Sequence, residues 1–564
     1  MEVSRRAAAL SRPLTAMLLL AVFSAGVAEE EVDLATIHRI KKEAYGRSRV
    51  MDTLFHLTDV HGPRLAGSPA YRKAAEWAVE RLEDWGADRA GIEEWDQFGR
   101  SWSFDRLSLH MTRPVVTPLS AVPMAWCRGT EGPVRAEVVL APLFPEEEGT
   151  EVRFDLRRYE DLIADYAEAQ RGRLRGKAVL LHAERKLEPA VASPTTRYDD
   201  EGLTSLGMAP EPVIHEPYEW PLMKMPADPE ERSKAMDGVP LEVSRSFFEE
   251  RRRVEGGLHR FLAEEGAAAV LRVDDRGDGF IVFAEASGSH EVGAPIPPPT
   301  LMLAPEQYNR MARLVEKGIP VEIELDLRSD LVDEPVPGRN VIAEIRGRSR
   351  PEEIVMLGAH FDSWHGGTGA TDNASGSAVA MEVMRILAAL DLPIERTVRL
   401  ALWDGEEQGL RGSRAYVREH LGDPVTMELK PAHESFYAYF NLDNGGGKIR
   451  GVYLQENDMA RPIFAAWLAP FEDEGVTTIS IRNTGGTDHL SFDAVGLPGF
   501  QFIQDPLDYM SRTHHSNMDV YDHVEASDLM QASAVMAAVV HHAATREEPF
   551  PRKPLPDPLP PRKE

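Results

Sequence analysis

The stretch EEIVMLGAHFDSWHGGTGATDNASG, residues 352–376, decides the fold of this chain. It begins as an apolar strand, passes through a polar, glycine-rich turn and leads into a helix expected over 375–390. Further strands and helices alternate on both sides of it, and they are NVIAEIRG (340–347), RTVRLALWD (396–404), 410–420, FYAYFNLD (436–443) and 527–544. This alternation predicts an α/β fold in three layers, in which helices flank a mainly parallel, mixed sheet.

Side chains that can bind metal gather at the ends of these strands. They are His360, Asp372, Glu406, Glu407, Asp443 and His515, in the segments 358–376, LALWDGEEQGLRGS (400–413), FNLDNGGG (440–447) and THHSNMDV (513–520). Open α/β sheets place their chemistry outside the carboxyl ends of their strands, so we expect these groups to meet. Imidazole and carboxylate ligands with open positions for water are what a hydrolytic zinc pair needs. The set therefore predicts a hydrolytic site with two Zn²⁺ ions.

Local position indicates what individual residues do in such a site. Asp362 follows His360 by two residues and can accept a ring N–H, which would fix the tautomer of a metal-binding imidazole. Asp372 opens the next helix and is a natural bridging ligand. Glu406 and Glu407 are adjacent in a turn, so one can bind metal while the other faces the water. Alone, a Glu-Glu pair is usually a solvated helix start and a His-x-Asp is usually structural; only the ordered set favours a metal site.

Changes in the sequence pattern divide the rest of the chain into segments. Residues 29–115 are expected to form the first part of a catalytic domain, with an amphipathic helix from about Tyr71 to Trp85. Residues 116–330 contain short β-like runs, which are GKAVLLH (176–182), AAAVLRV (267–273) and FIVFAEA (280–286). A linker ends at 335–338, and the alternating segment is assigned to 331–548. Residues 549–564 are expected to be a disordered, Pro-rich tail.

Composition narrows the class of protein and its compartment. The 564 residues carry a formal net charge of −29, which argues against nucleic-acid binding. A start with three arginines precedes an apolar stretch over 14–27, and the small residue Ala28 ends it. Residues 1–28 therefore read as a cleaved Sec-type signal peptide of a secreted or periplasmic protein without stable membrane insertion; a retained anchor is the alternative. The single Cys127 has no activating neighbours and is expected to be buried filler.

The ordered motifs resemble the co-catalytic zinc exopeptidases, a family that includes bacterial leucyl aminopeptidases, glutamate carboxypeptidase II and carboxypeptidase Q. The order here is HxD, DN-x-SG, EExGLxGS, NLD, (T/S)DH-xx-F and H(S/T)-xx-D, and GPRLAGS (62–68) looks like the family's N-terminal signature. The HFDSW, GGTD and HHS stretches look closer to carboxypeptidase Q. The resemblance covers nearly the whole mature chain and implies that 116–330 is an inserted, β-rich protease-associated domain.

The resemblance also implies how the ligands are shared between two zinc ions. His360 and Glu407 would bind one ion, and Asp443 and His515 would bind the other. Asp372 would bridge the two. This distribution is an expectation about side-chain directions, which the structure can test.

Catalytic roles follow from the same resemblance. Glu406 would be the general base, and the peptide bond Asp372–Asn373 would be strained. Many aminopeptidases of this kind carry a tyrosine that helps to hold the oxyanion, but RNTGGTDHLSF (482–492) has Thr484 and two glycines there. His489 is the candidate for contact with substrate or transition state, a structural histidine being the alternative.

The leading expectation is a zinc-dependent exopeptidase of short peptides or dipeptides. A glutaminyl cyclase with one zinc and a silent, receptor-like binding protein are the alternatives. The five intact ligand positions and the inserted domain argue against the first, and a silent protein should have lost ligands or the base that this chain keeps. Cleavage from the amino or the carboxyl end stays open. A carboxypeptidase needs a cation for the terminal carboxylate, and Arg482 and Arg512 lie near the site segments. A homodimer also stays open.

Overall fold

A computed structural model describes residues 30–144, 151–187, 193, 195–210, 218, 220, 222–236 and 238–561. Its strands are β1 (Arg89–Arg113), β2 (Thr117–Pro118), β3 (Ala121–Pro123), β4 (Val134–Leu140), β5 (Ala178–Leu180), β6 (Ala269–Arg272), β7 (Thr300–Leu303), β8 (Glu322–Ile345), β9 (Arg350–His360), β10 (Arg396–Trp403), β11 (Phe436–Asn441), β12 (Ile449–Tyr453), β13 (Thr478–Ser480) and β14 (Gly499–Gln504). Its helices are α1 (Leu34–Gly46), α2 (Val50–Phe55), α3 (Pro69–Asp84), α4 (Leu156–Gln170), α5 (Asp200–Gly207), α6 (Pro229–Met236), α7 (Leu241–Glu265), α8 (Pro305–Glu316), α9 (Ser375–Ala389), α10 (Arg411–His420), α11 (Ala432–Ser435), α12 (Arg461–Leu468), α13 (His489–Asp493) and α14 (Ala526–Thr545). Two short turns near the site are η3 (Ala370–Ala374) and η6 (Tyr509–Thr513).

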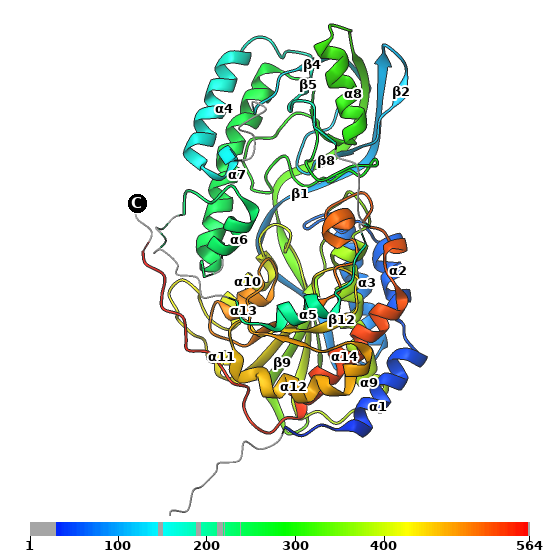
Figure 1. Ribbon diagram of the computed structural model, residues 1–564, viewed down its shortest axis with the longest axis vertical. Coiled ribbons are helices and arrows are strands. Elements are labelled where there is room, and N and C mark those ends of the chain that lie inside the picture. Colours follow the sequence, from blue (N-terminus) through cyan, green and yellow to red (C-terminus); the bar gives the residue numbers. More distant parts are fainter. Residues whose placement is uncertain are drawn as a thin grey trace, which may run out of the picture.

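The lower lobe in Figure 1 is an α/β domain built on a mixed, mainly parallel sheet. Its strands run in the order β13-β12-β14-β11-β9-β10-β8, and the neighbours of β9 are both parallel to it. β8 and β12 each add an antiparallel pairing. Helices α9 and α14 cover one face of the sheet, and α10 and α13 contribute to the core on the other. The predicted α/β fold with a flanked mixed sheet is confirmed.

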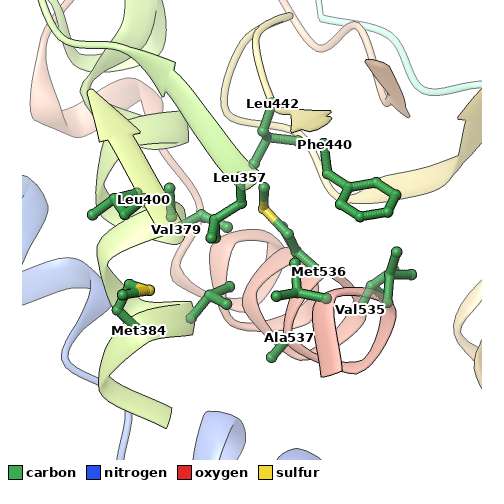
Figure 2. Packing of buried hydrophobic residues seen from close by; sticks show 14 of the residues in the cluster. Leu357, Val379, Met384, Leu400, Phe440, Leu442, Val535, Met536 and Ala537 are labelled. Carbon is green, nitrogen blue, oxygen red and sulfur yellow. The ribbon is translucent and has the colours of Figure 1, made fainter. Parts of the chain in front are cut away.

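The apolar runs of the sequence become strands because both faces of this sheet are covered. β9 is buried continuously from Val355 to His360, as expected for a central parallel strand. Figure 2 shows Leu357 of β9 among Leu400 of β10, Val379 of α9 and Met536 of α14. Burying such a side chain stabilises a fold by about 1.5–3 kcal/mol, so this cluster holds the strand ends firmly in register.

A long ribbon joins the two lobes. β1 and β8 pair antiparallel from Arg89↔Glu344 to Arg113↔Glu322, and they run from the lower into the upper lobe in Figure 1. The predicted boundary between 330 and 331 therefore falls inside β8, and residues 336–338 of the presumed linker 335–338 are paired with β1. The proline and glycine residues at 335–338 suggested a linker. The ribbon accommodates them through register shifts between Trp95 and Ser101.

The upper lobe is an α/β layer rather than a β-rich one. β4, β5, β6 and β7 are successively parallel, and α4, α7 and α8 lie beside them (Figure 1). The predicted strands 176–182 and 267–273 correspond to β5 and β6. The predicted strand 280–286 is wrong, because the structure places no strand over these residues and their pairings are the single bridges Phe283↔Ser516 and Ala125↔Ala286.

The C-terminal segment differs from the expected disordered tail over its described part. Phe550 is 4% exposed and belongs to the main core, where its ring lies 5.4 Å from that of Phe500. Lys553 forms a 2.6 Å ion pair with Asp493, and the Leu559 amide donates to the Val425 carbonyl. Phe550 therefore anchors the described part of this Pro-rich segment to the domain.

Two predictions concern the N-terminus and membranes. The predicted signal peptide 1–28 lies outside the described residues. Among the residues that the structure describes, no helix has the length and apolarity needed to cross a bilayer.

Candidate metal centre

The predicted ligands meet at one edge of the catalytic sheet. His360 ends β9, Asp372 lies in η3, Asp443 follows β11, and the Glu406–Glu407 turn follows β10. His515, just after η6, completes the group with a left-handed φ of 63°. All of them line a cavity of about 1260 Å³ between the two lobes. Parallel strands thus deliver ligands from four distant segments to a single cavity.

Asp372 lies between two acid–histidine pairs. Its Oδ1 is 3.2 Å from His360 Nε2, and that same nitrogen is 3.4 Å from Asp443 Oδ1. Its Oδ2 is 3.3 Å from His515 Nε2, which is 3.0 Å from Glu407 Oε2. The pairing of His360 with Glu407 and of Asp443 with His515 was therefore wrong. His360 groups with Asp443, and His515 with Glu407, because β9 and β11 are neighbours and aim their ends at the same point.

Surrounding hydrogen bonds fix the orientation of these ligands. His360 Nδ1 lies 3.0 Å from the Asp362 backbone carbonyl, and its distance to the Asp362 carboxylate is longer, 3.6 Å. The Asp362 carboxylate instead accepts from the backbone N–H groups of Glu406 at 3.2 Å and Glu407 at 3.4 Å. Asp362 thus ties the end of β9 to the Glu406–Glu407 turn. Its side chain also raises the pKa of His360, and the predicted role of orienting that ring stays a prediction.

Three further residues support Asp372 and His515, and sequence reasoning missed all of them. The Tyr509 hydroxyl donates to Asp372 Oδ1 at 3.0 Å, and Asp519 accepts from the Asp372 amide at 3.2 Å. Glu285 of the upper lobe lies 2.8 Å from His515 Nδ1. Asp519 was visible as the last residue of the H(S/T)-xx-D motif, whereas Glu285 sits in a segment with no metal-binding pattern.

Several acidic side chains are buried close together in the centre, and their pKa values are shifted. Burial, followed by the carboxylates of Asp443 and Asp488, raises the pKa of Glu406 well above its usual range. Burial and Asp372 raise the pKa of Glu407 to about 8. Burial opposes a charge on His360, but Asp443 and Glu406 raise its pKa well above the usual value. So many buried acids close together require compensating positive charge, from protons or from metal ions.

The donor set fits divalent zinc. Asp372 Oδ2, Glu407 Oε1 and Asp443 Oδ1 are buried and have no hydrogen-bond partner within the described residues. Orphaned carboxylate oxygens beside imidazole nitrogens are the ligand types that zinc takes. His360, Asp372 and Asp443 can offer ligand atoms within 4.8 Å of one another, and so can Asp372, His514 and His515. The Asp372–Asn373 peptide bond is cis.

Some predicted residues lie outside the centre. His489 is fully buried, its Nε2 lies 3.0 Å from the Thr484 carbonyl, and it is absent from the cavity wall, so the predicted substrate contact is wrong. Its neighbour Asp488 is also fully buried; burial raises the pKa of Asp488 to about 8, and Asp488 raises the pKa of Glu406. Cys127 is buried as expected, and burial raises its pKa to about 12.

Comparisons with known proteins agree with this geometry. Residues 340–540 match the model of Peptidase family M28. Carboxypeptidase Q of Bos taurus is 28% identical over 301 residues, or 53% of this chain and 60% of that protein. Aminopeptidase YwaD of Bacillus subtilis (strain 168) is 30% identical over 202 residues, or 35% of this chain and 42% of that protein. The chain thus spans about 60% of the first of these relatives and less of the second.

A solved structure matches nearly the whole fold. It is a peptidase M28 precursor from Shewanella amazonensis SB2B, with a TM-score of 0.62 and 23% identity. The match covers 93% of this chain and 98% of that chain. Both lobes therefore share the fold of that structure.

Proposed function

Residues 340–540 belong to peptidase family M28, and from this premise we propose that the protein is an exported, zinc-dependent exopeptidase that hydrolyses short peptides. One observation carries the proposal. Asp372 lies between two acid–histidine pairs in a cavity, and three of the carboxylate oxygens there have no hydrogen-bond partner in the described part of the chain. The relatives bear the names carboxypeptidase Q and aminopeptidase, which support a peptide substrate and leave the end of attack open.

Five residues would hold two zinc ions. His360 and Asp443 would bind one ion and His515 and Glu407 the other, with Asp372 shared. Bound zinc supplies Lewis-acid polarisation of the substrate carbonyl and a lowered pKa of water.

Glu406 is the residue placed for proton transfer. Its side chain lines the cavity, and the bond from its amide to Asp362 fixes the turn that carries it. In the proposed reaction its carboxylate takes a proton from the water that attacks the peptide carbonyl. It then gives that proton to the leaving amine, so that one base serves both halves of the reaction.

The test is hydrolysis of paired peptides by the zinc-loaded protein. One peptide carries a free amine and an amidated end, and the other a blocked amine and a free carboxylate. We expect cleavage of at least one, abolished by a chelator and restored by zinc. Glu406→Gln should lower kcat by at least about 100-fold because the base is lost, while retaining zinc because no ligand changes. Absence of cleavage in the zinc-loaded wild type would contradict the proposal, and loss of zinc from Glu406→Gln would make Glu406 a ligand.

A further inference from the structure

A group of arginines lines the same cavity as the predicted metal ligands. Helix α7 descends from the upper lobe toward α10 (Figure 1). It contributes Arg245, Arg251, Arg252, Arg253 and Arg260 to the cavity wall. Arg411 and Arg414 of α10 lie near the first of these, since Arg245 affects the pKa of both. In a chain with a net charge of −29, such a concentration of positive charge next to an acidic metal centre needs a reason.

Most of these arginines already have carboxylate partners. Arg414 and Arg245 share Glu242, at 2.6 and 2.9 Å, and Arg245 also pairs with Glu249. Arg251 lies 3.3 Å from Glu255. These ion pairs give Arg245, Arg251 and Arg414 a structural role. The remaining question is which arginine of the wall has no carboxylate partner.

Arg252 is the half-buried arginine of α7 with no carboxylate partner among the described residues, whereas Arg260 is exposed. Its Nε is buried without a hydrogen-bond partner, and among the described residues its guanidinium forms no ion pair. Glu291 and Glu249 attract it, while Arg245 repels it, and burial, the largest influence, lowers its pKa. A guanidinium stays charged in such surroundings and loses hydration there, so leaving it unpaired costs free energy. A bound anion would remove that cost.

Aromatic side chains connect Arg252's surroundings with the metal centre. The ring of His515 lies 6.0 Å from that of Trp364, which lies 6.1 Å from Trp126, and Trp126 lies 5.7 Å from His290. His290 Nε2 then contacts Arg411 at 2.8 Å, and Arg252 lowers the pKa of His290. Because these rings and Arg252 line one cavity, a ligand at the metals can extend along them toward Arg252.

The two arginines noted in the sequence are less suitable. Arg482 donates to the backbone carbonyls of Met208 and Ser205, at 3.1 and 2.7 Å. Neither Arg482 nor Arg512 is part of the cavity wall.

We infer that Arg252 binds a carboxylate of the peptide substrate, so that this enzyme selects peptides carrying a negative charge on the side that faces α7. The inference rests on the proposed peptidase function. A guanidinium offers two parallel N–H donors that match a carboxylate, which gives both affinity and direction. The carboxylate can be the C-terminus of the peptide or an acidic side chain, and these two sources call for different substrates in the test.

The experiment compares three peptides on the zinc-loaded full chain. They share one sequence: a free acid with a glutamate side chain, its C-terminal amide, and the free acid with glutamine in place of glutamate. kcat/KM is measured for the wild type, Arg252→Gln, Arg252→Lys and Arg157→Gln. Arg157 is an exposed residue of α4, outside the cavity wall. Binding of the same peptides to zinc-loaded Glu406→Gln, with and without Arg252→Gln, is measured by calorimetry.

We expect the wild type to prefer one carboxylate-bearing peptide over its neutral counterpart by about tenfold or more. Arg252→Gln should abolish that preference chiefly through KM, Arg252→Lys should restore part of it, and Arg157→Gln should keep it. If kcat/KM of the wild type falls with the C-terminal amide, Arg252 binds the C-terminal carboxylate. If kcat/KM falls with the glutamine peptide, Arg252 binds the acidic side chain. Equal activity on all three peptides, or a preference that survives Arg252→Gln in both assays, would overturn the inference alone. Absence of any hydrolysis by the wild type would instead contradict the proposed function.

Discussion

At the scale of single residues, the centre depends on how each carboxylate is aimed. Asp372 directs one oxygen to His360 and the other to His515, and Asp443 and Glu407 complete the two groups. The order of motifs was enough to predict that these five side chains meet. It could not predict their grouping, because adjacent residues in a turn point in different directions and only the packed strands determine which.

Double substitutions test this grouping. His360→Ala with Asp443→Asn removes two ligands of one ion, so the protein should keep about one equivalent of zinc. His360→Ala with Glu407→Gln removes a ligand from each group and should weaken both ions. Zinc is counted by mass spectrometry after dialysis, with wild type beside each variant. Retention of one equivalent by the second variant and of none by the first would restore the grouping that the resemblance implied.

At the scale of elements, continuous and periodic segments were predicted well, and segments with distant partners were not. Helix 375–390 and strand 396–404 correspond to α9 and β10, because their apolar pattern is long and local. The run 280–286 has the composition of a strand but lies against the loop of His515, where the Ala284 amide donates to the His515 carbonyl. Such a contact depends on how the lobes meet, which no local pattern records.

Helix α14 gives a prediction about pH. His541 in this helix is 3% exposed, and burial, followed by His542, lowers its pKa from 6.5 to about 4. Between pH 6.5 and about 4, His541 is therefore protonated in the unfolded chain and neutral in the folded chain. The contribution of neutral His541 to stability is complete above pH 6.5 and falls as the pH drops, by about 2 kcal/mol at pH 5.

The measurement is urea unfolding from pH 8 to 5. In His541→Gln, the free energy of unfolding should fall less steeply than in the wild type as the pH drops. His38→Gln changes an exposed residue of α1 and should keep the pH dependence of the wild type. A wild-type slope in His541→Gln would show that this histidine does not contribute to the acid sensitivity.

At the scale of the whole molecule, the upper lobe completes the site of the lower one. Glu285 of the upper lobe holds His515, and α7 lines the same cavity. The sequence indicated two regions but misplaced their junction, because β1 and β8 form one ribbon whose pairs join residues more than 200 positions apart. Hydrophobic patterning reports burial within a segment and is silent on such distant pairing.

Export is the prediction that concerns the entire chain. When the gene is expressed in a bacterium, we expect a mature protein beginning at Glu29 outside the cytoplasm, since a basic start, an apolar stretch and Ala28 precede it. Intact mass and N-terminal sequencing would identify this end. Ala28→Trp should block cleavage at this position, because the signal requires a small residue there. Recovery of the wild type with residues 1–28 still attached would contradict cleavage.

The most direct test of the account is a zinc titration of the metal-free protein, with peptide hydrolysis as the readout. Because two groups of ligands share Asp372, activity should rise with added zinc and reach its maximum at about two equivalents. A protein that binds zinc and cleaves none of the paired peptides at any zinc level would contradict the central claim, that this centre is a two-zinc peptidase site.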